Sequence, residues 1–381
     1  MIKIILLDVD SVLVYPGGYR AALRATVNHF INPHFEIDEE TLTDLERRGI
    51  SSEWDMAPLL LASYWTHILS RQPIQNLPPD VLSAGIEINR QCKVDLPTRL
   101  FVPEFPLVAG QFPAEAAFDA GCFLSIPFEL RKNLLTDTRN VRNSHTMRVF
   151  QHYTLGSEKF METYDLPGEF ETESFLLTHD RPIINYEIRT RLLHPNHRLA
   201  AFTGRPSAPP QEVQDSQNGY APEAELALEL VGLPDIPLIG YGRLEYLAKQ
   251  RGLDAATLLK PSPVQALAAI AAAFSGEEWT AVQAAADWQA TGRLNGVFSR
   301  LPSSFELIVV EDTMGGIKST LKAGEILQRA GKKITIQTLG LAFDGAASKA
   351  AAFEQAGIPF FNDWGALMDQ IEAGGKIEYE R

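Results

Sequence analysis

In the stretch "KIILLDVDSVL" (residues 3–13), an apolar run ends in two acids that are separated by one valine. Residues 3–7 predict a buried strand, since a short, uninterrupted apolar run is typical of a strand covered on both faces. Asp8 and Asp10 follow directly, where the strand enters its loop. A carboxylate at the end of a buried strand loses solvation. The pair therefore marks either a polar strand end or acid/base chemistry, and the stretch alone leaves both open.

The second half of the chain predicts the sheet to which this strand belongs. After residue 181, short apolar runs alternate with amphipathic helical patterns, which is typical of a parallel sheet covered by helices on both faces. We therefore expect an α/β fold, a Rossmannoid, doubly wound parallel sheet. The further strands are expected in RLAAF (198–202), IPLIGYG (236–242), ELIVV (306–310) and KITIQTLGLA (333–342), and IPFFND (358–363) is expected to be a strand or a loop.

The segment between the first strand and this alternating region has a different texture. Helical stretches such as "EWDMAPLLLASYWTHIL" alternate there with proline-broken runs, and no strand–helix alternation is visible. The simplest interpretation places a large, mainly helical domain, residues 16–189, inside a core formed by residues 1–15 and 190–381. The Ala-rich region 264–300 predicts two packed helices and indicates no chemistry.

Composition excludes several classes of protein. The chain has 381 residues, and 34 Lys+Arg against 48 Asp+Glu give a net charge of −14. Such an acidic surface disfavours nucleic acid and anionic membranes as partners. No apolar stretch is long enough to cross a bilayer or to form a signal peptide. The two cysteines have no metal-ligand spacing and suit a reducing compartment. We therefore expect a cytoplasmic protein with a small-molecule partner.

Polar residues gather where the predicted strands end, which is where open α/β sheets bind ligands. We expect up to four carboxylates, a hydroxyl and a lysine to meet there, and carboxylate oxygens are the ligands that Mg²⁺ prefers. Taken singly, Thr203 also fits a turn hydroxyl, Lys260 a surface lysine and Glu311 a cap of the following helix. The full set is Asp8 and Asp10, then Thr203, Gly204 and Arg205, then Lys260, then Glu311 and Asp312.

Four of these stretches, taken in order, resemble the four motifs of the haloacid dehalogenase superfamily of phosphohydrolases. "LLDVDSVL" (6–13) resembles motif one, and "AAFTGR" (200–205) resembles motif two. "LKPSP" (259–263) resembles motif three in its Lys-Pro-x-Pro form, and "VVEDTMGGIKS" (309–319) resembles motif four in its Glu-Asp form. Each motif alone is a weak signal. Four in order, each at a strand end or a helix start, form a specific one.

The resemblance implies a Mg²⁺-dependent phosphohydrolase that acts on a small phosphorylated metabolite. Asp8 would attack phosphorus to form an aspartyl-phosphate, and Asp10 would protonate the leaving group and then activate water. The implied phosphate-binding residues are Thr203, Gly204 and Lys260. Mg²⁺ would be held by Asp8, Asp312 and the backbone carbonyl of Asp10, with Glu311 close by.

The inserted domain has the position of the C1 cap of that superfamily, where it would enclose a substrate or form the interface of a homo-oligomer. Ser11 stands where the family commonly has glycine, and the gap from Lys260 to Asp312 is longer than usual. Two alternatives remain. One is a pseudoenzyme that binds a phosphorylated ligand without turnover, and the other is a 2-haloacid dehalogenase, which would have no need of Asp10.

Overall fold

The computed structural model describes residues 1–32, 34–95, 97, 99–213, 219–343 and 346–374 of the chain. These residues form two compact units. The first, the core unit, combines Met1–Pro16 with Asp180–Arg381, and the second, the helical unit, is Gly17–His179. The helical unit is therefore an insertion between two segments of the core unit that are distant in sequence.

The chain returns to the core unit at residue 180, not at residue 190 as the sequence pattern predicted. One cause is β3 (Arg181–Pro182), which pairs antiparallel with β2 (Val14–Tyr15). Another is α10 (Tyr186–Leu192), which buries Ile188 and Leu192 in the core of this unit. Strands of two residues are too short to show an alternating pattern, so no pattern in the sequence indicates this pairing.

A six-stranded sheet in the order β5-β4-β1-β6-β7-β8 forms the centre of the core unit. All adjacent strands pair in parallel. The predicted α/β class is thus confirmed. The strands are β1 (Lys3–Leu7), β4 (His197–Phe202), β5 (Leu238–Ile239), β6 (Ser304–Glu311), β7 (Lys333–Leu341) and β8 (Phe360–Phe361).

The position of β1 in this order places the candidate site. β1 lies between β4 and β6, and Leu7 is opposite Ala201 of β4 and Val310 of β6. The strands β4 and β5 extend the sheet to one side of β1, whereas β6, β7 and β8 extend it to the other. In open α/β sheets, ligands bind at the carboxyl ends of the strands where the order reverses in this way. The residues that follow β1, β4 and β6 are therefore neighbours at that edge.

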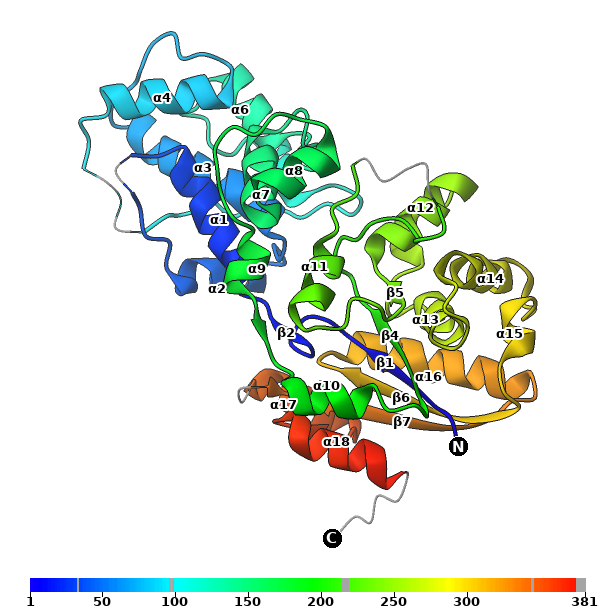
Figure 1. The fold of residues 1–381 in the computed structure, drawn as a ribbon. Coiled ribbons are helices and arrows are strands. Elements are labelled where there is room, and N and C mark those ends of the chain that lie inside the picture. The colour runs from blue at the N-terminus through cyan, green and yellow to red at the C-terminus, as the bar shows by residue number, and fades with distance from the viewer. Residues whose placement is uncertain (33, 96, 98, 214–218, 344–345, 375–381) are drawn as a thin grey trace. The chain divides into compact units, whose positions relative to one another are not determined.

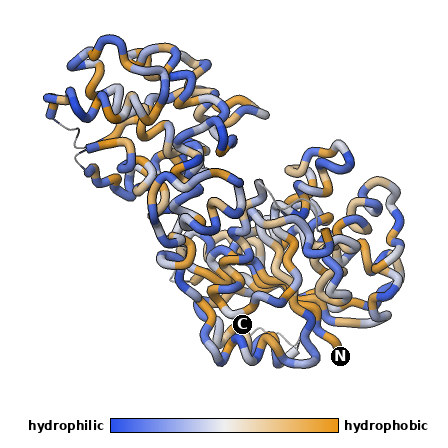
Figure 2. Tube along the Cα trace, turned by 45° about the horizontal axis from the view of Figure 1, so that its top comes forward, coloured by the Kyte–Doolittle hydropathy of each residue, from blue (hydrophilic) through white to orange (hydrophobic). Residues whose placement is uncertain are grey.

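Helices cover both faces of the sheet (Figure 1). Ile4 and Leu6 of β1 enter the apolar cluster on one face, and Ile5 and Leu7 enter the cluster on the other. Figure 2 shows the sheet as a largely hydrophobic band within the core unit. The helices of this unit after α10 are α11 (Glu223–Leu230), α12 (Tyr241–Arg251), the 3₁₀ turn η1 (Ala255–Thr257), α13 (Pro263–Ser275), α14 (Glu278–Thr291), α15 (Val297–Arg300), α16 (Met314–Arg329), α17 (Ala347–Ala356) and α18 (Trp364–Ala373).

The Ala-rich region forms two packed helices, as predicted, and the first of them is a layer of the core. Helix α13 packs on β1, β4 and α16, and its run of alanines is almost wholly buried. Helix α14 packs on α13 from outside. Glu278 of α14 accepts hydrogen bonds from the backbone N–H of Leu238 in β5 at 2.7 Å and from Arg243 of α12 at 3.0 Å. This buried carboxylate fastens α14 to the edge of the sheet.

Every element that the structure describes in the helical unit is an α-helix, around one apolar cluster. Helix α3 is its centre, with Trp65 and Tyr64 fully buried. Among the described residues of both units, no helix combines the length and apolarity needed to cross a membrane. The helices are α1 (Gly18–His29), α2 (Glu39–Arg47), α3 (Glu53–Leu69), α4 (Val81–Gln91), α5 (Pro113–Asp119), α6 (Phe128–Leu135), α7 (His145–Leu155), α8 (Ser157–Tyr164) and α9 (Phe175–His179).

Candidate functional site

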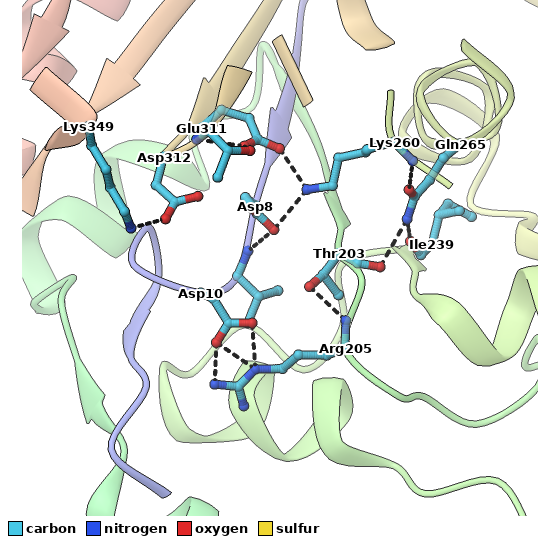
Figure 3. A network of polar contacts seen from close by, with 12 residues as sticks. Asp8, Asp10, Thr203, Arg205, Ile239, Lys260, Gln265, Glu311, Asp312 and Lys349 are labelled. Atoms are coloured by element: carbon cyan, nitrogen blue, oxygen red, sulfur yellow. Dashed lines mark hydrogen bonds and ion pairs between the residues drawn. The ribbon is translucent and has the colours of Figure 1, made fainter. Parts of the chain in front are cut away.

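Three buried carboxylates meet at the carboxyl ends of β1 and β6. Asp8, Glu311 and Asp312 each offer one oxygen atom, and these atoms all lie within 4.8 Å of one another. Asp8 follows β1, where its backbone N–H donates to the carbonyl of Val310 at 3.1 Å. The neighbouring parallel strands therefore bring together acids that are about 300 positions apart in the sequence. We call these three residues the acidic triad (Figure 3).

Lys260 inserts its ammonium between two members of the acidic triad. Its Nζ lies 2.6 Å from Glu311 Oε1 and 3.1 Å from Asp8 Oδ1. The same ammonium stands over the ring of Phe202, 4.4 Å from its centroid. The backbone N–H of Lys260 donates to Gln265 Oε1 at 3.1 Å. Lys260 is therefore a largely buried partner of Asp8 and not a surface residue.

The burial and charges of this cluster shift the pKa values of its members. Burial and repulsion by Glu311 raise the pKa of Asp8 well above its usual range, although Lys260 opposes the shift. Burial lowers the pKa of Lys260, but attraction by Asp8 and Glu311 outweighs it, and the net shift is upward. Lys260 is therefore an ammonium that compensates part of the negative charge of the acidic triad. A further positive charge beside Asp8 would favour the ionised form of Asp8.

Glu311 owes its place to a glycine on the following helix. A Cβ atom on Gly316 of α16 would lie 1.6 Å from Glu311 Oε1, so only glycine leaves room for this carboxylate. Glu311 Oε2 accepts hydrogen bonds from the backbone N–H of Thr313 at 3.2 Å and from its hydroxyl at 2.9 Å. Glu311 thus makes capping contacts at the start of α16 and also belongs to the acidic triad. Its role toward a metal ion stays a prediction.

The carboxylate of Asp10 has a different partner and is outside the acidic triad. Arg205 donates to it from Nε, 2.9 and 3.0 Å from the two oxygens, and from Nη2 at 2.6 Å. The same guanidinium donates to Asp180 Oδ2 at 2.9 Å. The side chains of Arg205 and Asp180 are 1% and 0% exposed, whereas that of Asp10 is 34% exposed. As a metal ligand, Asp10 could act only through its backbone carbonyl, and that role stays a prediction.

The sequence indicated Arg205 as a residue at a strand end but assigned it no role, and it gave no sign of Asp180. Asp180 is the first residue of the second segment of the core unit. It lies 25 positions from Arg205 and 170 positions from Asp10 (180 minus 10). No local pattern marks such a contact, because it depends on where the chain re-enters the core unit after the insertion.

Thr203 and Gly204 lie at the end of β4, beside the acidic triad. The hydroxyl of Thr203 is buried and accepts from the backbone N–H of Arg205 at 3.2 Å. Gly204 is exposed, and a Cβ built on it would meet nothing within 4 Å. Gln265 of α13 donates to the carbonyls of Thr203 and Ile239, at 2.9 and 2.8 Å, and so fixes the ends of β4 and β5. The sequence offered no reason to single out this glutamine.

The loop after Asp10 is a tight turn in which Ser11 has a φ of +59°. This left-handed region favours glycine, which accounts for the glycine common in the resembling family. Serine brings a hydroxyl, and Lys349 of α17 donates to it at 3.1 Å. Lys349 also donates to Asp312. Trp364 of α18 donates to the carbonyl of Val12 at 2.7 Å and holds the same turn from another side.

Comparisons with known proteins show the fold and leave the activity open. No protein-family model matches the chain, and no curated protein matches it. A solved structure does match, an X-ray structure of a Northeast Structural Genomics Consortium target, with a TM-score of 0.65. The two chains are 17% identical, and the match covers 98% of each. At this identity the likeness shows a shared fold alone.

The donor set of the acidic triad fits a small divalent cation. Three carboxylate oxygens within reach of one another are hard ligands, and nitrogen and sulfur ligands are absent from the triad. The acidic triad brings three carboxyl groups against two ammonium groups, those of Lys260 and Lys349, and a bound cation would favour the ionised form of Asp8. The geometry suits Mg²⁺ as well as other hard divalent ions, and it does not by itself select one.

Proposed function

We propose that the protein is a Mg²⁺-dependent phosphohydrolase that acts on a small phosphorylated metabolite through an aspartyl-phosphate on Asp8. The observation that carries this proposal is the acidic triad with Lys260 inserted between Asp8 and Glu311. The four stretches that resemble the phosphohydrolase motifs are those whose side chains meet at this edge of the sheet. Three buried carboxylates at one edge of the sheet are held against two ammonium groups, those of Lys260 and Lys349, and this excess of carboxylates supports a cation site over a balanced structural ion-pair network.

The residues divide the proposed reaction into two displacements. In the first, an oxygen of Asp8 forms a bond to phosphorus while the bond from phosphorus to the leaving oxygen breaks, and Asp10 gives that oxygen a proton. In the second, Asp10 takes a proton from water, whose oxygen attacks phosphorus and releases Asp8. Lys260 and Thr203 would hold the phosphate oxygens that do not react. A bound Mg²⁺ would offset the repulsion between the carboxylate and the phosphate.

The arginine beside Asp10 is part of the same proposal. Arg205 donates hydrogen bonds to both oxygens of Asp10. The guanidinium is itself held by buried Asp180 and therefore fixes the direction in which the carboxyl group points. Positioning of this kind is what proton transfer to a leaving group requires, because the donor must lie within hydrogen-bond reach of it.

The test is hydrolysis of a panel of small phosphomonoesters with Mg²⁺ and with a chelator. Turnover should require the cation, fall by at least about 10³-fold in Asp8→Asn and fall by about 10²–10⁴-fold in Asp10→Asn. Asp235→Asn, an exposed acid of the core unit, is the matched control and should keep the wild-type rate. Phosphomonoester turnover that survives both the chelator and Asp8→Asn would contradict the proposal.

The alternatives give different results in the same experiment. Tight binding of inorganic phosphate with no turnover under any divalent ion would identify a pseudoenzyme that binds a phosphorylated ligand. Halide release from a 2-haloacid, insensitive to the chelator, would identify a dehalogenase. The three carboxylates of the acidic triad favour the cation-dependent reaction over the dehalogenase.

A further inference from the structure

Each member of the acidic triad has an ammonium group as its partner. Lys260 serves Asp8 and Glu311, and Lys349 serves Asp312. The two lysines approach the acidic triad from opposite sides, Lys260 from the segment before α13 and Lys349 from α17 (Figure 3). Without a divalent ion, the repulsion among the three carboxylates is therefore relieved by the protein's own cations.

The two lysines differ in how firmly they are held. Lys260 has a side chain 13% exposed, two carboxylate partners and the ring of Phe202 below its ammonium. Lys349 has a side chain 32% exposed, and it reaches Asp312 at the end of a flexible stem. Rotation about the bonds of such a stem carries an ammonium into water at little cost. Of the two, Lys349 is the one that can leave.

Ser11 gives Lys349 a second partner and so defines its place. The Ser11 hydroxyl lies 3.1 Å from the Lys349 ammonium, although the left-handed backbone at this position favours glycine. A glycine would relieve the backbone and would remove the hydroxyl. Serine is therefore less favourable than glycine for the backbone at this position, but its hydroxyl makes a hydrogen bond that keeps Lys349 beside Asp312.

We infer that Lys349 is an internal counter-ion of the cation site, bound to Asp312 when the site lacks a divalent ion and displaced from it when one binds. Two like charges within a few ångströms repel strongly in a partly buried site, whereas the ion pair of a partly exposed lysine is weak. The divalent ion therefore displaces Lys349 from the carboxylate of Asp312, and the competition lowers the affinity of the site for the ion. The inference rests on the function proposed above, because it takes the acidic triad to be a cation site.

The experiment is a titration of the full chain with Mg²⁺ by calorimetry, and with Mn²⁺ by electron paramagnetic resonance, without substrate. Lys349→Met should bind either ion about three- to tenfold more tightly, since a competing positive charge is gone. Lys349→Arg keeps the charge and should stay within about twofold of the wild type. Lys318→Met removes an exposed charge from α16, near the acidic triad in sequence, and is the matched control with no expected change.

A second variant keeps the test valid if Lys349→Met folds poorly. Ser11→Gly removes one of the two partners of Lys349 and relaxes the backbone, so it should tighten binding in the same direction by a smaller factor. In the wild type, adding Mg²⁺ should also speed amide hydrogen exchange in α17, and Lys349→Met should abolish that response. These readouts need no catalytic turnover.

Three results would overturn the inference. Weaker binding in Lys349→Met would mean that the lysine stays on Asp312 and orients it toward the ion. Unchanged binding would mean that it does not compete. Absence of divalent-ion binding in every variant would remove the cation site and the proposed function with it. Cation binding tightened by Lys349→Met in a protein with no phosphatase activity would refute only the proposed function.

Discussion

The sharpest prediction on stability concerns Asp180, the buried partner of Arg205. The substitution Asp180→Asn keeps the size of the side chain and removes its charge, leaving a guanidinium 1% exposed with less compensation. Breaking a buried ion pair by removing one partner costs about 3–5 kcal/mol. Arg205 retains Asp10, and an asparagine carbonyl can still accept one hydrogen bond. We therefore expect a loss of about 3 kcal/mol in the free energy of unfolding.

The same arginine supplies the matched control. Asp10 accepts hydrogen bonds from Arg205 on both of its oxygens, but its side chain is 34% exposed. Water screens such a pair and replaces lost contacts, so Asp10→Asn should cost about 0–1 kcal/mol. The comparison therefore tests whether the burial of a carboxylate decides how much stability its pairing with Arg205 contributes.

The assay is equilibrium unfolding in urea, followed by circular dichroism. Because two compact units can unfold separately, hydrogen exchange in peptides that contain β4 should report the stability of the core unit itself. A loss of less than about 0.5 kcal/mol in Asp180→Asn would refute the reasoning. An equal loss of unfolding free energy in Asp10→Asn would refute it too, because the burial of the carboxylate would then have no effect on the size of the loss.

Three further predictions concern packing, charge and pH. Gly316→Ala should displace Glu311 and cost about 1–3 kcal/mol of stability by overpacking. Gly315→Ala should be tolerated, because its Cβ would meet its nearest atom at 3.6 Å. Urea unfolding measures the stability of both variants. Glu278→Gln should cost about 2 kcal/mol in the same assay, because it removes a charge buried against the guanidinium of α12. Burial lowers the pKa of His152 in the helical unit. The folded protein therefore resists protonation of this histidine, so the histidine's contribution to stability is present above about pH 6.5 and is lost as the pH falls below that value. The melting temperature should be lower at pH 5.5 than at pH 7.5. His152→Gln should make this difference smaller.

Each of these predictions can fail on its own. Equal costs for the two glycine variants would mean that the space around Glu311 is not limiting. An unchanged stability in Glu278→Gln would mean that the carboxylate of α14 is dispensable to the fold. The same pH dependence with and without His152 would assign the acid sensitivity to other groups.

Much of the fold follows from patterns that the sequence displays openly. Residues 3–7 are apolar throughout because β1 is central and covered on both faces. The acids at 8, 311 and 312 could be recognised in the sequence because carboxylates at the end of a buried apolar strand, or directly after it, contrast with that strand. Parallel pairing of β1 with β6 then places these acids at one edge, so the members of the acidic triad could be predicted from the sequence.

The remaining features depend on contacts between distant segments. Lys349 lies on α17, in an Ala-rich helix with no motif, and it meets Asp312 only because α17 follows β7 back to the same edge of the sheet. Asp180 meets Arg205 only where the chain returns from the helical unit. The local sequence around a lysine or an aspartate in a polar segment does not indicate a partner that is distant in the chain. The return of the chain at residue 180 was missed for the same reason.

The most direct test of the central claim is to trap the phosphoryl group on the protein. The chain is mixed with Mg²⁺ and a labelled phosphomonoester, quenched in acid, digested and mapped by mass spectrometry. We predict a phosphoryl group on Asp8, absent with a chelator and absent in Asp8→Asn. Hydrolysis of the same ester with no phosphoryl group on Asp8, or with a phosphoryl group on another residue, would contradict the claim that this carboxylate is the nucleophile.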